Sequence, residues 1–292
     1  MALLLAISAC FSFSIGSAVF TKFSKKISPL WMNFFKLLIA TGVFLLLGLV
    51  FWKEFTLISS TSLVLLLVSG IIGLFMGDQL LLSAFKKIGA SRTLVVFSFQ
   101  PIFISIWAFL ILGQKTNSMQ YVAVFFLVLC IFFISFENFE KSKNWEIKGL
   151  SMALGGVLLD GIGVTLTRLA FDKSPEIGSI PANLIRCVGA LVMIFLYIKI
   201  KKRPFLKHFK NCTKSERYEL AIGSSLGTFV SLSLWLQAIK IGHLTSVTAA
   251  AGTSPIFSAV IEMWQEKKAP SKYLLASLLS LFTGLYILAV NQ

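Results

Sequence analysis

Charged side chains are scarce in this chain of 292 residues, because only 13% of them are Asp, Glu, Lys or Arg. An average soluble domain contains about 25% charged residues, which help to cover its surface. Hydrophobic residues instead make up 57% of the chain, and its mean hydropathy is +0.86. The composition therefore excludes an ordinary soluble domain and predicts a protein whose main solvent is lipid.

Histidine and cysteine are also rare, with two and four residues respectively. They are His208, His243, Cys10, Cys130, Cys187 and Cys212. Neither type occurs at the spacing of a metal site, and no two aspartates lie one helical turn apart. These absences argue against a membrane-embedded enzyme, such as an intramembrane hydrolase or a lipid-group transferase. We expect no catalytic residue, metal or cofactor, and we interpret the cysteines as apolar filling.

Apolar segments long enough to cross a bilayer recur along the whole chain. A helix needs about 17 to 25 apolar residues to span the hydrocarbon core. Such segments lie near residues 2–21, 30–52, 62–85, 93–112, 119–136, 149–171, 180–200, 218–239, 245–264 and 272–290. The first has its lysines after it rather than before it, which indicates a retained span and not a cleaved signal. We predict an all-α polytopic membrane protein with ten transmembrane helices.

Two halves of the chain carry the same short motifs in the same order. The matched pairs are Asn33-x-x-Lys36 with Asn183-x-x-Arg186, Gly73-x-x-x-Gly77 with Gly223-x-x-x-Gly227, Lys87-Ile88-Gly89 with Lys240-Ile241-Gly242, and Pro101-Ile102-Phe103 with Pro255-Ile256-Phe257. This order indicates a duplication into residues 1–136 and 149–292, joined by a linker at 137–148. Five helices per half would make the repeats inverted, which places a substrate site near the midplane between them.

The basic residues are distributed unevenly between the predicted links. The net charge is +15, but Lys and Arg occur in short runs and form no continuous basic face, so we expect no nucleic-acid partner. Links after odd-numbered spans hold 20 of the 27 Lys and Arg residues, and the other links hold five. The largest group runs from Lys199 to Arg217, which we interpret as a cytoplasmic loop, with a lipid-headgroup site as the alternative. The positive-inside rule then places both termini outside the inner membrane.

Ionisable groups inside a bilayer are costly unless paired or hydrated, so each one is a functional candidate. Lys36 and Asp78 each lie about 10 Å from the cytoplasmic end of their helices, at 1.5 Å per residue. Gln100 reaches a similar depth, so these three side chains can form one polar cluster. The alternative is an ion pair that only holds two helices together. The other ionisable candidates are Glu262, Arg168, Asp160 and Arg186.

Asp160 and Arg186 belong to the predicted second half. Asp160 lies at the midplane of its span, where a carboxylate suits the binding and release of a proton during transport. The alternatives are that it pairs with Arg186 or stays protonated as a hydrogen-bond donor between helices. The guanidinium of Arg186 can bind a substrate carboxylate or phosphate. Alternatively, it can hold its helix in place through hydrogen bonds to loop carbonyls.

Prolines lie at matched positions of two predicted spans. Pro101 and Pro255 each remove a backbone hydrogen bond and free a carbonyl, which predicts helix kinks beside a binding site, with a packing bend as the alternative. Thr253 and Ser254 precede the second proline and are binding candidates. The Gly-x-x-x-Gly motifs instead indicate close helix packing. Further candidates for cavity lining are Trp235, Gln237, Thr165 and Thr167.

Together, these features resemble the drug/metabolite transporter superfamily, EamA type. The resemblance covers nearly the whole chain and rests on the two five-helix repeats, on Lys36 and Arg186 early in the second and seventh helices, and on the repeated Pro-Ile-Phe. Further matches are the helix ends Ala84 to Gly89 and Ala238 to Gly242, and the pairs Gly113-Gln114 and Gln265-Glu266.

The resemblance implies ten helices around a central cavity and transport of small metabolites, amino acids or drugs, often outward. Expected partners are a small-molecule substrate, the lipid bilayer and protons as the coupling ion, for a monomer or a homodimer. Two features depart from the family: the charge count places the termini outside, and Lys36 replaces a more usual arginine. A flippase, or a transporter for lipid-linked or nucleotide-sugar substrates, is the alternative function. A passive channel fits less well, because a self-contained inverted repeat does not call for oligomeric symmetry.

Overall fold

The computed structural model describes residues 1–112, 146–201, 212–242 and 247–290, apart from 249 and 268, and isolated residues between 119 and 140. Every regular element within these residues is helical. Several features of the sequence lie outside the described residues: Gly113-Gln114, Cys130, His208, His243, most of the span at 119–136, and most of the linker at 137–148.

Helices of the first half alternate between long spans and short pieces. They are α1 (Ala2–Ser24), α2 (Pro29–Gly48), α3 (Trp52–Phe55), α4 (Ser60–Ser69), η1 (Gly70–Gly77), α5 (Asp78–Ile88), α6 (Ala90–Phe97) and α7 (Gln100–Leu112). The start of α2 follows from local sequence, because the Ser28 side chain accepts from the Trp31 backbone N–H and Pro29 takes the first helical position. The segments α4, η1 and α5 form one continuous helix, of which η1 is π-helical.

The second half repeats this pattern. Its helices are α9 (Ile147–Lys173), α10 (Ser179–Ile200), α12 (Lys214–Ser224), η2 (Ser225–Val230), α13 (Ser231–Ile241), η3 (Ala250–Thr253), α15 (Ser254–Glu266) and α16 (Lys272–Val290). A π-helical segment, η2, again interrupts a long helix. A capping box between Thr213 and Glu216 starts α12.

Six helices in the described part of the chain are long and apolar enough to cross a membrane. They span Ala2–Ser24, Pro29–Gly48, Ser60–Ile88, Ile147–Lys173, Ser179–Ile200 and Lys214–Ile241. Two shorter apolar helices occupy Ala90–Ile104 and Lys272–Gly284. The protein is therefore a polytopic helical membrane protein, and six of the ten predicted spans appear as long helices.

Regular α-helix is interrupted just before the two prolines at which helix kinks were expected. Pro101 is the second residue of α7, which follows α6 after a two-residue break. Pro255 is the second residue of α15, which follows the 3₁₀ turn η3. Proline has no backbone N–H to donate, and the first turn of a helix does not need one. Each proline therefore fits the first turn of its helix.

Glycines allow the π-helical segments to pack closely against the first helix of the opposite half. A Cβ at Gly163 in α9 would lie 3.1 Å from the Gly73 Cα in η1. In the same way, a Cβ at Gly227 in η2 would lie 2.7 Å from the Gly16 Cα in α1. Because backbone meets backbone at both crossings, the structure confirms close packing as the role of the Gly-x-x-x-Gly motifs.

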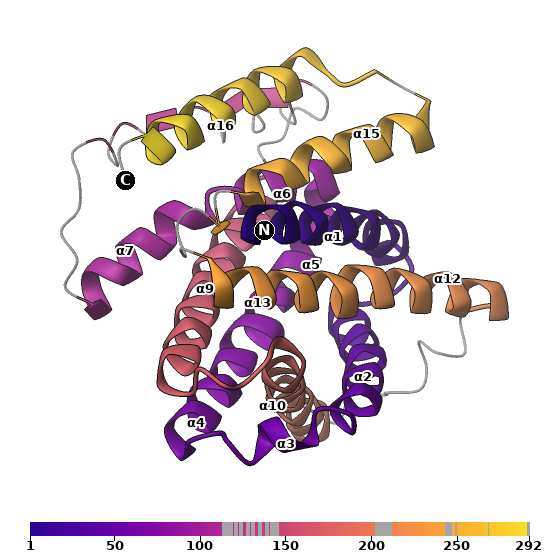
Figure 1. Ribbon diagram of the computed structural model, residues 1–292. Coiled ribbons are helices and arrows are strands. Elements are labelled where there is room, and N and C mark those ends of the chain that lie inside the picture. Colours follow the sequence, from indigo (N-terminus) through magenta and orange to yellow (C-terminus); the bar gives the residue numbers. More distant parts are fainter. Residues whose placement is uncertain are drawn as a thin grey trace.

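Helices of the two halves pack against one another, as Figure 1 shows. Helix α1 packs against α12, η2 and α13, and its counterpart α9 packs against α4, η1 and α5. Likewise α2 contacts η2 while α10 contacts η1, and α6 contacts α15. These helices therefore make equivalent contacts with the other half.

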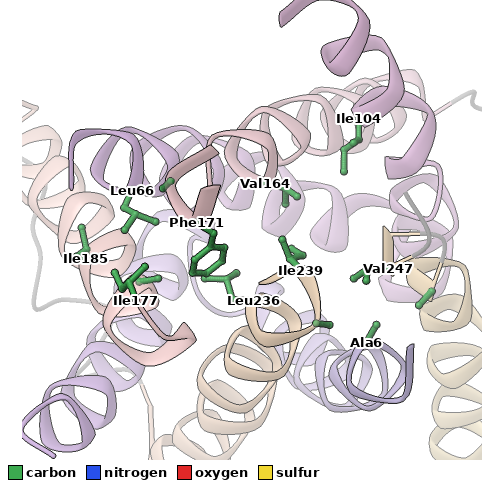
Figure 2. Close-up of a cluster of buried hydrophobic side chains, with 14 residues drawn as sticks. Ala6, Leu66, Ile104, Val164, Phe171, Ile177, Ile185, Leu236, Ile239 and Val247 are labelled. Carbon is green, nitrogen blue, oxygen red and sulfur yellow. The ribbon is translucent and has the colours of Figure 1, made fainter. Parts of the chain in front are cut away.

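A buried hydrophobic cluster joins the halves (Figure 2). Its members come from α1, α4 and α7 of the first half and from α9, α10 and α13 of the second. Phe171 and Leu236 are examples, and they are 4% and 0% exposed. Since both halves share this core, neither forms a separate compact domain.

Candidate functional site

A cavity of about 100 Å³ lies where helices of both halves meet. Much of its wall is apolar and includes Phe13, Leu81 and Phe97. Its polar side chains are Lys36, Asp78, Gln100, Asp160, Thr228, Ser231 and Ser254. The structure thus brings side chains from α2, α5, α7 and α9 that the sequence singled out into one site.

Lys36 and Asp78 form an ion pair in the cavity wall. Their side chains are only 3% and 13% exposed, so the pair is largely withdrawn from water. Asn33, one turn before Lys36, donates its side-chain amide to the carbonyls of Leu74 (3.1 Å) and Phe75 (3.2 Å). This link holds α2 against η1 just before Asp78 and so fixes the position of the ion pair.

Asp160 is the central residue of α9 and accepts a hydrogen bond from the side-chain amide of Gln100. Gln100 is 3% exposed and begins α7 directly after the break before Pro101. A cluster of Gln100 with Lys36 and Asp78 was expected. Instead the four side chains line the same cavity as two pairs, Lys36 with Asp78 and Gln100 with Asp160.

Arg186 lies beside the cavity lining and is 1% exposed. Its Nε donates to the Ser69 hydroxyl (3.0 Å), and its Nη1 donates to the Asn183 side-chain oxygen (3.4 Å). These partners are neutral side chains and not the loop carbonyls considered above. In the part of the chain that the structure describes, Arg186 forms no ion pair with a carboxylate, Asp160 included.

The cavity lining also includes hydroxyl groups and an indole. Trp235 and Ser254 line the cavity, as the sequence predicted, and so does Thr228. The Thr228 hydroxyl is buried without a hydrogen-bond partner among the described residues. Thr253 is not in the lining, because its hydroxyl donates to the Ala250 carbonyl (2.7 Å) within η3.

The other residues that the sequence singled out lie outside the cavity lining. The hydroxyls of Thr165 and Thr167 donate to the carbonyls of Gly161 and Gly163 in their own helix. Arg168 donates to the carbonyls of Ile239 (2.7 Å) and Gly242 (3.0 Å) and so ties α9 to the end of α13. Glu262 accepts from the Ser91 backbone N–H (3.0 Å) at the start of α6. Pro101, Pro255 and Gln237 are also absent from the lining. These residues belong to helix packing and helix ends.

Sequence reasoning missed the contribution of α1. Ala9, Cys10 and Phe13 line the cavity, and the Cys10 thiol donates to the Ala250 carbonyl (3.4 Å). This segment contains neither a charged residue nor a proline to draw attention to it. The only available signal is its series of small residues, which lets other elements approach closely.

The segment Gly223 to Gly227 matches the Gly-x-Ser-x-Gly motif of hydrolases. In those enzymes the serine lies on a sharp turn between a strand and a helix, which exposes it for attack. Here Ser225 begins η2 within a continuous membrane-length helix. The motif therefore serves helix packing and gives no support to a hydrolase.

Comparison with known proteins agrees with this architecture. Residues 1–136 and 147–290 match the EamA-like transporter family. The chain belongs to this family. A relative from Archaeoglobus fulgidus, described as an uncharacterized transporter, is 22% identical over 260 residues, which cover 88% of this chain and 87% of the relative.

A solved structure, described only as "Crystal structure of protein", is similar to this EamA-like transporter with a TM-score of 0.71. The match covers 99% of this chain and 96% of that chain at 15% identity, so it shows a shared fold and no more. Family membership and the six long apolar helices make the protein a multi-pass membrane transporter of the drug/metabolite transporter superfamily, EamA type.

Proposed function

We propose that this EamA-like transporter is a secondary active transporter that exports small metabolites, such as amino acids, across the inner membrane by alternating access. The observation that carries the proposal is the cavity between the halves. Its lining is largely apolar but includes one ammonium group and two carboxylates. In transporters built from repeats, the substrate site typically lies at such an interface, near the bilayer midplane.

The proposal assigns ten transmembrane helices to two inverted repeats, residues 1–136 and 149–292. The equivalent contacts of α1 and α9 support it, as do the π-helical segments in the third long helix of each half. Asn33 and Asn183 add a further match, because each donates to a carbonyl of the long helix that contains the π-segment, Asn183 to that of Leu232 (2.9 Å). Rocking of one repeat against the other would expose the cavity to each side in turn.

A zwitterion complements the charges in the cavity. Lys36 and Asp78 neutralise each other there. An amino acid brings the same two charges, so its carboxylate can bind Lys36 and its ammonium can bind Asp78 or Asp160 without burying net charge. The apolar wall near Phe13 and Trp235 would receive the substrate side chain.

Asp160 is the proposed proton-coupling group. It lies at the centre of a long membrane helix and its hydrogen-bond donor, Gln100, is neutral. A carboxylate at this depth is stable when it is protonated or paired, so a change of partner can accompany gain or loss of a proton.

Uptake into proteoliposomes tests the proposal. Purified protein would be reconstituted and offered a labelled amino-acid mixture with and without an imposed pH gradient, beside Asp160→Asn and empty vesicles. We expect gradient-dependent uptake by the wild type and loss of that dependence in Asp160→Asn. Uptake no greater than in empty vesicles under any gradient would reject amino acids as substrates, and lipid-linked or nucleotide-sugar substrates would then be tested.

A further inference from the structure

An acidic and a basic side chain lie near each other in the second half without forming an ion pair. Asp160 is hydrogen-bonded to Gln100, while the buried Arg186 donates to Ser69 and Asn183. A guanidinium withdrawn from water is most stable beside a carboxylate. Hydrogen bonds to neutral groups stabilise its charge less than an ion pair would.

Gly73 lies beside both groups. A Cβ placed on Gly73 would lie 3.6 Å from Oδ1 of Asp160 and 3.7 Å from Nη2 of Arg186. The Cα of Gly163 lies at a similar distance from that position, 3.7 Å. Because Gly73 has no side chain, the space beside the carboxylate and the guanidinium that a Cβ would take is left open, and this space is called the gap at Gly73.

Of the two cations that act on Asp160, Arg186 is the one that is not paired with another carboxylate among the described residues. The charged groups that act on Asp160 are Asp78 from α5, Lys36 from α2 and Arg186 from α10. Lys36 is already paired with Asp78, and α7 contributes the neutral Gln100.

We propose that Asp160 exchanges partners, bonding to Gln100 when protonated and to Arg186 when ionised, through the gap at Gly73. The proton leaves the Asp160 carboxyl for the aqueous side that the cavity faces, and the carboxylate then forms an ion pair with the Arg186 guanidinium. The exchange draws the centre of α9 toward α10 across η1. If the protein is the proton-coupled transporter proposed above, Arg186 and Gly73 are positioning residues of its coupling step.

Arginine ¹⁵N resonances give a test that needs no substrate. The chain contains five arginines, so the guanidinium spectrum of ¹⁵N-arginine-labelled protein in liposomes is simple enough to assign. The Arg186 signal is the one missing from Arg186→Lys. We expect this signal to shift between pH 5 and pH 8 in the wild type and to stay fixed in Asp160→Asn.

Gly73→Ala tests the gap, and Gly42→Ala is its control. The new methyl group of Gly73→Ala would lie 3.6 Å from Oδ1 of Asp160 and 3.7 Å from Nη2 of Arg186, at ordinary van der Waals distance from both. A Cβ at Gly42 meets nothing within 4 Å. We expect the pH-dependent shift of Arg186 to fall by at least about half in Gly73→Ala and to be unchanged in Gly42→Ala.

An Arg186 signal that is independent of pH in the wild type would overturn the proposal, and so would a full titration in Gly73→Ala. If Gly73→Ala does not fold, the pH dependence of the Arg186 signal in the wild type and in Asp160→Asn still tests the partner exchange. The result is separable from transport. A wild type that titrates but carries no substrate rejects the proposed function alone, whereas one that carries substrate without titrating rejects the partner exchange alone.

Discussion

At the scale of single residues, the Lys36 and Asp78 pair shows how helix geometry brings distant positions together. Both depths follow from counting 1.5 Å per residue along two neighbouring helices, so their contact was predictable from the sequence. The partner of Gln100 was not, because its position depends on the chain break before Pro101. The hydrogen-bond partners of Arg186 were also unpredictable, because its bond to Ser69 depends on how α10 crosses the long helix α4–η1.

Removal of one member of this ion pair should be costly. In Asp78→Asn the Lys36 ammonium loses its carboxylate while remaining largely buried, which typically destabilises a protein by about 3 to 5 kcal/mol. Replacing both residues with apolar ones, as in Lys36→Met with Asp78→Leu, should recover most of that loss. Denaturant unfolding in detergent measures both variants. A double variant as unstable as Asp78→Asn would contradict the account.

The thiol of Cys212 should react slowly at neutral pH. Cys212 lies between α10 and α12, and burial raises the pKa of its thiol, so less of the reactive thiolate is present. In a variant without the other cysteines, we expect maleimide to modify Cys212 several-fold more slowly at pH 7 than a cysteine at the exposed Lys25. The difference should narrow as the pH rises through the pKa of Cys212. Equal rates at pH 7 would show that the thiol is freely accessible.

At the scale of elements, the crossings of α9 with η1 and of α1 with η2 define how the halves fit together. The Gly-x-x-x-Gly motifs predicted close packing, but the sequence did not reveal that each motif packs against the opposite half. That pairing follows from tertiary packing, because α1 contacts α12, η2 and α13 while α9 contacts α4, η1 and α5. The same limit applies to the prolines, since the two-residue turn before α7 and the 3₁₀ segment before α15 were not apparent from the sequence.

The substitution Gly163→Ala should weaken the crossing of α9 and η1. Its new methyl group would lie 3.1 Å from the Gly73 Cα and 3.1 Å from the Ser69 carbonyl oxygen, and backbone atoms cannot move aside as a flexible side chain can. We expect a loss of about 1 to 3 kcal/mol in unfolding free energy, which is typical of overpacking. Gly42→Ala, which meets nothing within 4 Å, should change stability little. Equal stability of the two variants would show that the crossing tolerates a wider separation.

At the scale of the whole molecule, composition and repeated motifs were sufficient to predict a polytopic helical transporter. The course of the chain in two predicted spans was harder to predict, because a two-residue turn precedes Pro101's helix and the 3₁₀ segment η3 precedes that of Pro255. The location of the cavity also depends on tertiary packing, since α1 contributes Cys10 and Phe13 and neither residue is charged or a proline.

Orientation remains a prediction from charge, and cysteine labelling tests it. In a cysteine-free background, Lys207→Cys lies in a predicted cytoplasmic link and Glu176→Cys in a predicted external link. We expect an impermeant maleimide to label Glu176→Cys in intact cells, and to label Lys207→Cys only after permeabilisation. The reverse pattern would place both termini in the cytoplasm, as is usual for the family.

The most direct test of the central claim is to fill the cavity. Ser231 lines it and is 6% exposed, whereas Ser233 lies in the same helix outside the lining. With uptake of the labelled amino-acid mixture as the assay, Ser231→Phe should lower the rate at least about tenfold, and Ser233→Phe should transport like the wild type. Thermal unfolding of both variants would show that each is folded. If folded Ser231→Phe transports as fast as the wild type, substrate does not pass through this cavity and the account is wrong.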